Sequence, residues 1–327
     1  MLCPARQLVF PEPRIYSEFS FARPYRKGVC LSNPPQVSVI VPVFNSEATI
    51  QRALDSVAAQ TVKDLEIIAV DDASTDGSGD VVTRWAGGRV TLLRHSHNRG
   101  AAAARNTGIA AARGHWLAFL DADDAWKPEK LSRQFSILGQ ERGRIPACVS
   151  GYDLHKDGRT LAIHLPIRPH QFRRQILFGC TIGPGSTLVA ERRVFDEIGG
   201  FDEAFRRLED WDWLLRYSER YELAFVTEPL ADVYVESTEA PPAARRSNPE
   251  LDGIHRMGTK HLSQLGSWAE RMQLRSSLLF ERGAALYRGH RPLAAALYVI
   301  SAFCIYPMRN IASFRTLRYS AGARLFK

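Results

Sequence analysis

The sequence predicts an α/β protein with a Rossmann-like, mostly parallel sheet flanked by helices. Short apolar runs at 37–41, 65–70, 90–93 and 116–120 alternate with segments of helical periodicity. Strands that alternate with helices form right-handed βαβ units, and helices then cover both faces of the sheet. Several of these runs end abruptly in polar or acidic residues. This is typical of strands whose carboxyl ends form a ligand-binding edge.

The predicted elements follow one another closely in the first half of the chain. The strand Val37–Val41 is β-branched and stops at Pro42. Residues 50–58 place apolar side chains at helical spacing. The next elements are a strand at Leu65–Val70, a helix at about 78–86, a strand at Val90–Leu93, an Ala-rich helix at about 101–112 and a strand at 116–120.

After Lys130 the alternation is less regular. The pattern predicts a helix near 128–140, a strand at Ala147–Tyr152, a Gly-rich loop at Gly179–Thr187 with a short strand after it, and a helix at Glu209–Tyr217. Residues 236–253 are polar and contain Pro241-Pro242, which indicates a mobile loop, and the remaining residues are mostly helical.

Three regions follow from this pattern. Residues 1–35 are rich in Pro and Arg and form an extended N-terminal arm, 36–235 form the α/β domain, and 236–327 form a mobile loop with a helical, basic C-terminal tail. Five scattered cysteines indicate a reducing compartment rather than a disulfide framework or a zinc cluster. No signal-peptide run occurs in residues 1–20, so we expect a cytoplasmic location.

The net charge of +8 is concentrated in the tail. From Arg282 to Lys327 there are eight Lys or Arg residues and no Asp or Glu, which accounts for the whole excess. Such a patch favours an anionic surface. Residues 293–306 are apolar nearly all round, but fourteen helical residues span roughly 21 Å, short of a bilayer core. Two interpretations stay open: packing on the α/β domain, or peripheral contact with an anionic membrane on its inner face.

Three carboxylates close the fourth predicted strand. Asp121, Asp123 and Asp124 follow the apolar run 116–120 directly. Clustered carboxylates repel one another, and a hard divalent cation such as Mg²⁺ or Mn²⁺ neutralises them. Alternatively, Asp124 caps the helix that begins near Pro128, and the other two are solvated in a turn.

The ends of three predicted strands should meet on one edge of the sheet. Asp72 there can accept the imide N–H of a uracil, and Phe44 can flank the base. The alternative makes Asp72 a turn residue and Phe44 part of the core. Neither a dinucleotide fingerprint nor a P-loop occurs, so a metal and basic side chains must hold a diphosphate. His95 and His97 are interpreted as exposed strand-end histidines rather than metal ligands.

Five motifs in order carry a family resemblance. They are Val37–Asn45, Val70–Asp76, Asn98-Arg99-Gly100 with Ala104–Gly108, Phe119–Asp124, and Gly199–Asp202 with Glu209-Asp210-Trp211. Over residues 36–235 the chain closely resembles the inverting glycosyltransferases of family 2, which have a GT-A fold.

The resemblance implies roles for individual residues. Those near the donor nucleotide are Pro42, Asn45 and Glu47 in the first loop, Asp72 at the base, and Arg99 and Arg105, of which Arg105 could instead pair with an acid. Asp121 matches the aspartate on the sugar–ribose side, and Asp123 the metal ligand of the DxD motif. Asp210 matches the catalytic base.

The sequence departs from the family at one point. Many relatives carry a Tyr-Arg-x-His-like element that touches the diphosphate or metal, but here Tyr234 is followed by Val235-Glu236-Ser237. The candidates to take its place are Arg245, Arg246, His255 and Lys260, and the sequence does not choose among them. The Gln-x-x-Arg-Trp element of processive synthases is also absent, so single addition is expected.

The expected function is a metal-dependent, inverting transfer of one sugar. The donor would be a nucleotide-diphosphate sugar, most simply UDP-linked, and the acceptor a hydroxyl of a saccharide or lipid-linked glycan in cell-surface polysaccharide synthesis. No nucleic acid partner is expected. The rival functions are a nucleotidyltransferase, or another nucleotide-sugar enzyme, and a non-catalytic membrane-associated binding module. On a helix, Asp210 and Asp212 point about 200° apart, so we expect Asp210 to face the sheet and Asp212 the solvent.

Overall fold

The computed structural model describes residues 34–85, 90–141, 143–164, 172–179, 185–235 and 248–306. The predicted arm at 1–35 therefore lies almost wholly outside the described residues, and so do 236–247, which contain Arg245 and Arg246, and the tail from 307. The described residues belong to one compact unit, Pro34–Lys327.

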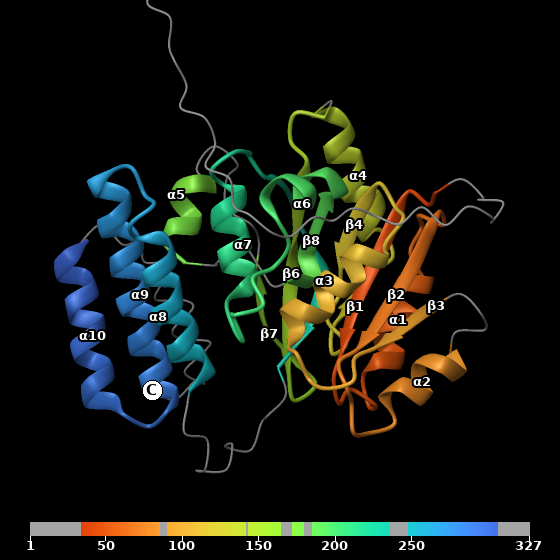
Figure 1. The fold of residues 1–327 in the computed structure, drawn as a ribbon, viewed down its shortest axis with the longest axis horizontal. Helices are drawn as coiled ribbons and strands as arrows, with labels where there is room; N and C mark the ends of the chain where they lie inside the picture. Colours follow the sequence, from red (N-terminus) through yellow and green to blue (C-terminus); the bar gives the residue numbers. More distant parts are fainter. Residues whose placement is uncertain are drawn as a thin grey trace, which may run out of the picture. The chain divides into compact units, whose positions relative to one another are not determined.

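A mixed sheet is the centre of this unit, and within the described residues it contains nine strands (Figure 1). The strands are β1 Val37–Val43, β2 Leu65–Asp71, β3 Val90–Arg94, β4 Trp116–Phe119, β5 Ala125–Trp126, β6 Ala147–Lys156, β7 Arg159–His164, β8 Leu188–Glu191 and β9 Ala224–Tyr234. The order is β3-β2-β1-β4-β8-β6-β9-β5, and β7 pairs with β6. Neighbours among β1 to β4 are parallel, whereas β8 runs antiparallel to both β4 and β6. The predicted mostly parallel α/β sheet is confirmed.

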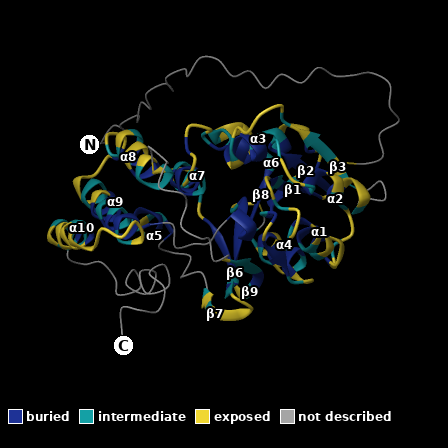
Figure 2. Cartoon of the chain, turned by 90° about the horizontal axis from the view of Figure 1, so that it is seen from below, coloured by how far each residue is buried: buried dark blue, intermediate teal, exposed yellow. Residues whose placement is uncertain are grey.

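Helices lie on both faces of the sheet, as the alternation predicts. The helices of the described residues are α1 Ile50–Ala58, α2 Ser78–Trp85, α3 Ala101–Ala111, α4 Lys130–Gln140, α5 Phe172–Leu177, α6 Arg192–Ile198, α7 Glu209–Tyr217, α8 Pro249–His261, α9 Trp268–Arg288 and α10 Pro292–Ile305. The last three, α8 to α10, lie beside the sheet at one end of the unit rather than on its faces (Figure 1). Figure 2 shows that the buried residues concentrate along the sheet and the helix faces turned toward it.

Alternate residues of each strand enter two separate cores. In β1, Val39 and Val41 pack with Leu54 of α1, whereas Ile40 belongs to the cluster that contains α3 and α7. This follows from the two-residue period of a strand. Gly108 lets α3 approach β1 closely, because a Cβ there would lie 2.4 Å from Ile40 Cγ2.

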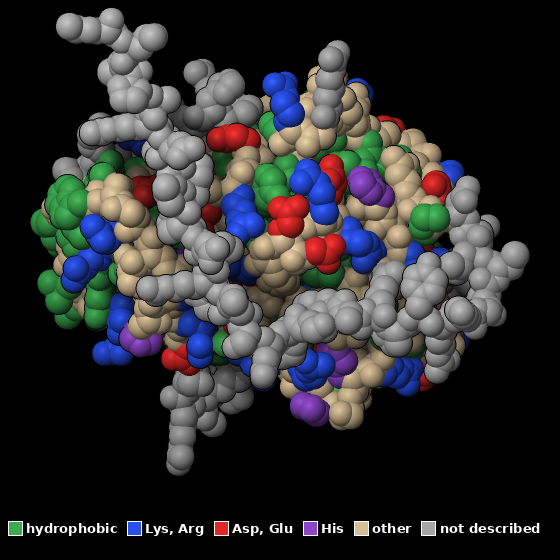
Figure 3. All heavy atoms as spheres, turned by 45° about the horizontal axis from the view of Figure 1, so that its top comes forward, with side chains coloured by type: hydrophobic (Ala, Val, Ile, Leu, Met, Phe, Trp, Pro, Cys, Tyr) green, Lys and Arg blue, Asp and Glu red, His purple; other side chains and the backbone are tan. Residues whose placement is uncertain are grey.

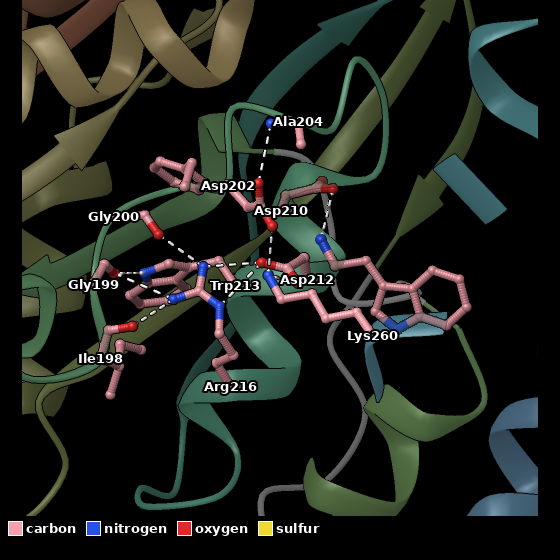
Figure 4. A network of polar contacts seen from close by, with 12 residues as sticks. Ile198, Gly199, Gly200, Asp202, Ala204, Asp210, Asp212, Trp213, Arg216 and Lys260 are labelled. Carbon is pink, nitrogen blue, oxygen red and sulfur yellow. Dashed lines mark hydrogen bonds and ion pairs between the residues drawn. The ribbon is translucent and has the colours of Figure 1, made fainter. Parts of the chain in front are cut away.

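A buried ionic network attaches helix α7 to α8 (Figure 4). Asp212 is fully buried: Arg216 Nη2 lies 2.9 Å from its Oδ2, while Lys260 Nζ and His261 Nε2 lie 2.7 and 2.8 Å from its Oδ1. The expectation that Asp212 faces solvent is therefore wrong, because α8 covers that side of α7. Arg216 also donates to the Gly200 carbonyl, and Lys260 pairs with Asp202.

The C-terminal helices pack on one another. Gly283 of α9 lets α10 approach, since a Cβ there would lie 2.8 Å from Val299 Cγ2. Ser276 Oγ donates to the Ala302 carbonyl at 2.8 Å. The predicted C-terminal helical appendage is thus present. In the described part of the chain, no helix is both long enough and apolar enough to cross a bilayer.

Candidate active site

A cleft of about 830 Å³ lies at the carboxyl ends of β1, β2 and β4. The parallel register brings these three ends together, and the Asp72 N–H donates to the Val43 carbonyl at 2.8 Å. Of the residues predicted for the site, Pro42, Phe44, Asp72, Arg105, Asp121 and Asp123 line the cleft. Phe44 is 47% exposed, so it is not part of the core. The volume suits a nucleotide-sized ligand.

Asn45 and Glu47 join the first loop to the second. Asn45, at a φ of 48°, accepts the Thr75 N–H through Oδ1 at 2.8 Å. Glu47 Oε2 accepts the Gly77 N–H at 3.0 Å, and the Glu47 N–H donates to Asp76. Neither residue lines the cleft, so their geometry indicates that they hold the loop bearing Phe44 in place.

Asp72 binds the backbone of the segment that leads into α3. Its carboxylate accepts the N–H groups of Arg99 and Gly100 at 2.9 and 2.7 Å, and His95 Nδ1 lies 2.6 Å away. The side chain of His95 is only 7% exposed, and its Nε2 lies 2.9 Å from Thr107 Oγ1. The prediction of an exposed His95 is therefore wrong, because Asp72 and Thr107 contact the two nitrogens of its ring from either side. The Arg99 side chain pairs with Glu203 and does not line the cleft.

Arg105 connects the two halves of the site. Its guanidinium is buried, with Nη2 at 2.6 Å from Asp121 Oδ1 and Nη1 at 2.6 Å from Glu209 Oε1. Asp121 follows strand β4, and Glu209 is the first residue of helix α7. The alternative that Arg105 pairs with an acid of the fold thus matches its contacts, although the residue also lines the cleft.

The carboxylates after β4 differ in environment. Asp123 is exposed, whereas Asp124 is buried and accepts the Ser186 hydroxyl and, at 3.2 Å, the Tyr234 N–H. Burial and the carboxylates of Asp121 and Asp123 raise the pKa of Asp124 well above its usual range. This cluster of oxygen donors with one exposed member fits a hard divalent cation. Helix α4 begins at Lys130, and the structure gives Asp124 no capping bond to it.

Asp210 occupies the first turn of α7, beside Glu209. It is half-buried, and its Oδ1 accepts the Trp211 N–H at 2.8 Å. Burial and the Glu209 carboxylate raise the pKa of Asp210 to about 6, against the attraction of the Arg105 cation. A carboxylate with a pKa near the working pH is suited to accept a proton.

Several basic residues at the cleft and beside it were not predicted from the sequence. Arg206 and Arg207 are exposed and line it, and Arg206 Nη1 donates to Asn98 Oδ1 at 3.2 Å. Arg52 of α1 donates to the Asp123 carbonyl and lies 3.7 Å above the ring of Tyr234. Two consecutive arginines just before an acidic helix start were the available signal for the first pair. Arg52 lies in an amphipathic helix of common pattern, and nothing in the sequence around it indicated a role at the site.

The proposed substitutes for the missing histidine have different surroundings. Lys260 is held between Asp202 and Asp212, and His255 lines a neighbouring pocket with Arg206. A separate set of possible metal ligands, Asp153, His155 and Asp232, lies on β6 and β9 with ligand atoms within 4.8 Å of one another. Within it, Lys127 pairs with Asp153, and His155 pairs with Asp232.

The comparisons with known proteins give the family to which this fold and its strand-end cleft belong. The model of glycosyl transferase family 2 matches residues 38–199. The amylovoran biosynthesis glycosyltransferase AmsB of Erwinia amylovora is 32% identical over 210 residues, which cover 61% of this chain and 69% of that protein. The chain belongs to glycosyltransferase family 2.

A second relative has a more specific description. It is the UDP-Glc:alpha-D-GlcNAc-diphosphoundecaprenol beta-1,3-glucosyltransferase WfaP of Escherichia coli, 36% identical over 121 residues that cover 37% of this chain and 47% of that one. Across the first three curated relatives, the chain spans between 47% and 69% of their lengths.

Solved structures share the fold. Staphylococcus aureus TarS 1-349 in complex with UDP-GlcNAc matches with a TM-score of 0.56 at 18% identity, covering 86% of this chain and 92% of that chain. The Pyrobaculum calidifontis mannosyltransferase PcManGT, in complex with GDP-Man and Mn²⁺, matches with a TM-score of 0.55 at 21% identity, covering 90% and 81%. The predicted GT-A fold is confirmed.

Proposed function

We propose that this chain transfers a single sugar from a UDP-sugar to a hydroxyl of a saccharide or lipid-linked glycan, with inversion at the anomeric carbon. The observation that carries the proposal is the arrangement across Arg105. One end of this residue pairs with Asp121, two residues before the candidate metal ligand Asp123, and the other pairs with Glu209, next to the candidate base Asp210. A donor site and a base are thereby fixed relative to one another.

The uracil is assigned to the edge formed by Phe44 and Asp72. Phe44 is exposed at the cleft and offers a flat apolar surface to a base. Asp72 already accepts two backbone N–H groups and lies against His95, but a carboxylate has about four acceptor positions, so a uracil imide N–H has a place. The UDP-GlcNAc bound to the structural relative TarS supports a uridine donor.

The diphosphate is assigned to Asp123 and to the arginine pair 206–207. Asp123 would hold a Mn²⁺ or Mg²⁺ ion, which supplies charge stabilisation to the departing diphosphate. Arg206 and Arg207 line the same cleft and offer planar donors that match phosphate oxygens. We infer that these two arginines contact the diphosphate in place of the histidine that this sequence lacks. The Mn²⁺ in the PcManGT complex supports a divalent ion.

Asp210 acts as the general base. Its carboxylate removes the proton of the acceptor hydroxyl, whose oxygen attacks the anomeric carbon from the face opposite the nucleotide. The bond from that carbon to the diphosphate oxygen breaks, and UDP leaves with the bonding electron pair. Arg105 holds Glu209 and thereby the first turn of α7, so that Asp210 approaches the acceptor in a fixed orientation.

We further propose that the reaction takes place on the cytoplasmic face of a membrane, in cell-surface polysaccharide synthesis. The name of the relative WfaP specifies an undecaprenyl-linked acceptor, and AmsB is named for polysaccharide biosynthesis. The basic tail gives this chain an affinity for anionic lipid.

A donor panel tests the function. The full chain is incubated with UDP-, GDP- and dTDP-sugars and undecaprenyl-linked or free saccharide acceptors, with Mn²⁺, with Mg²⁺ or with a chelator. We expect metal-dependent release of UDP that requires an acceptor. Release of inorganic pyrophosphate instead would identify a nucleotidyltransferase and contradict the proposal.

A further inference from the structure

Helix α10 exposes a stripe of large apolar side chains. Leu293, Leu297 and Ile300 are 84%, 68% and 59% exposed, and their spacing places them on one face of the helix. Figure 2 shows exposed residues along this helix, and hydrophobic side chains gather at the corresponding end of the molecule in Figure 3. Soluble monomers rarely leave adjacent large apolar side chains in water without a binding role.

The exposed stripe is not a buried face of α10 that lacks its packing partner. The opposite face of α10 is already packed on α9 through small residues, with Ala295 and Ala302 buried. Gly283 brings the two helices close, and the Ser276 hydroxyl binds the Ala302 carbonyl. A surface helix normally turns its polar face to water. Here the face toward the protein carries the small residues, and the outer face carries the large apolar ones.

The charge next to α10 identifies the kind of partner. After Glu281 the sequence has no acidic residue, and the cations that follow α10 in the sequence are Arg309, Arg315, Arg318, Arg324 and Lys327. Among the described residues, Arg282 lies 5.1 Å over the ring of Tyr298 on α10, and Arg291 directly precedes the helix. A symmetric interface between two copies of this chain pairs like with like, so it would bring two such sets of cations together. An anionic bilayer surface attracts the cations and also accepts the apolar stripe.

We infer that α10 lies along the surface of an anionic lipid bilayer, with Leu293, Leu297 and Ile300 inserted at the level of the headgroups. The helix is roughly 21 Å long, too short to cross the hydrocarbon core but suited to lie in its interface. The inference rests on the proposed membrane location and names the surface that makes the contact. It does not depend on the transfer chemistry.

Vesicle flotation with the full chain tests the inference. The probe is vesicles of phosphatidylglycerol with phosphatidylcholine, compared with phosphatidylcholine alone, at low and high salt. We expect binding only to the anionic vesicles. Leu297→Glu combined with Ile300→Glu should weaken it by about a hundredfold, tenfold for each apolar side chain lost. A chain ending at Tyr306 should lose about fivefold for each cation removed.

Ile163→Glu is the matched control, since Ile163 is 62% exposed on β7, far from α10 in the sequence. It should bind vesicles as the wild type does. Equal flotation of the α10 double variant and the wild type would overturn the inference, and so would wild-type binding that ignores lipid charge. Dimers in light scattering that the double variant abolishes, without vesicle binding, would show that a second copy covers the stripe. UDP affinity by calorimetry should be the same in all variants, so a failure of donor binding is seen separately.

Discussion

Replacing Asp210 by Asn should lower activity and raise stability together. Burial and the Glu209 carboxylate raise the pKa of Asp210 from 3.8 to about 6. The folded chain therefore holds this proton more tightly than the unfolded chain. Stability falls as the pH rises from about 4 to about 6, and it stays lower above that range.

The size of the effect follows from the shift. Two pKa units correspond to about 3 kcal/mol, and because Asp210 is only half-buried, contact with water reduces this to about 1–2 kcal/mol. Asn cannot ionise, and its Oδ1 can still accept the Trp211 N–H. We therefore expect a melting temperature a few degrees above wild type at neutral pH, with the difference vanishing below about pH 4.

Asp212→Asn is the matched control, two residues along the same helix. Although burial opposes its ionisation, the hydrogen bond from His261 and the cations of Arg216 and Lys260 lower the pKa of Asp212 to about 2. This carboxylate contributes about 2 kcal/mol above about pH 4, which is lost as the pH falls through about 2. Its replacement should therefore lower the melting temperature at neutral pH.

Calorimetric unfolding across pH and initial rates at saturating donor measure both effects. A base contributes roughly 10²–10⁴ in rate, so the Asp210→Asn chain should lose nearly all transfer while UDP affinity stays close to wild type. If its melting temperature fell like that of Asp212→Asn, Asp210 would be an ordinary helix-start acid. Turnover above about a tenth of wild type would refute the base role.

Two further substitutions test the metal ligand and the link between Arg105 and the base. Asp123→Ala should remove the gain in UDP affinity that Mn²⁺ gives the wild type in calorimetry, and a variant that still shows the full gain would contradict the metal assignment. Arg105→Met leaves two carboxylates without their cation, so it should destabilise the fold by about 3–5 kcal/mol. It should also move the acid limb of the pH–rate profile upward, because the attraction that lowers the pKa of Asp210 is lost. An unmoved acid limb in a folded variant would show that Arg105 does not influence the base.

The fold was predictable because its signals are local. The apolar runs that begin at Val37, Leu65, Val90 and Trp116 each form a strand within a residue or two of the predicted bounds. Parallel pairing then requires their carboxyl ends to share one edge, which is why Asp72 and Asp123 were expected near each other. The two-residue strand Ala125–Trp126 was missed, since its pairing with β9 depends on residues about a hundred positions later.

The environment of the site residues was less predictable, because it depends on contacts distant in sequence. His95 follows a strand, so the sequence pattern predicts an exposed side chain, but in the fold its ring lies between Asp72 and Thr107. The sequence pattern places Asp212 on the polar side of an amphipathic helix. That side is buried only because α8 packs against it. The order of the motifs identified Asp210 as the candidate base. It did not indicate that its neighbours Glu209 and Asp212 would form ion pairs with basic side chains.

The stereochemistry of a single transfer tests the central claim most directly. With an α-linked UDP-sugar, Mn²⁺ and the acceptor identified by the panel, proton NMR of the first-formed product reports the anomeric configuration. One displacement assisted by Asp210 predicts a β-linked product that appears together with UDP, and none from Asp210→Asn. An α-linked product would require a different mechanism and would contradict the assignment of Asp210 as the base of a single inverting step.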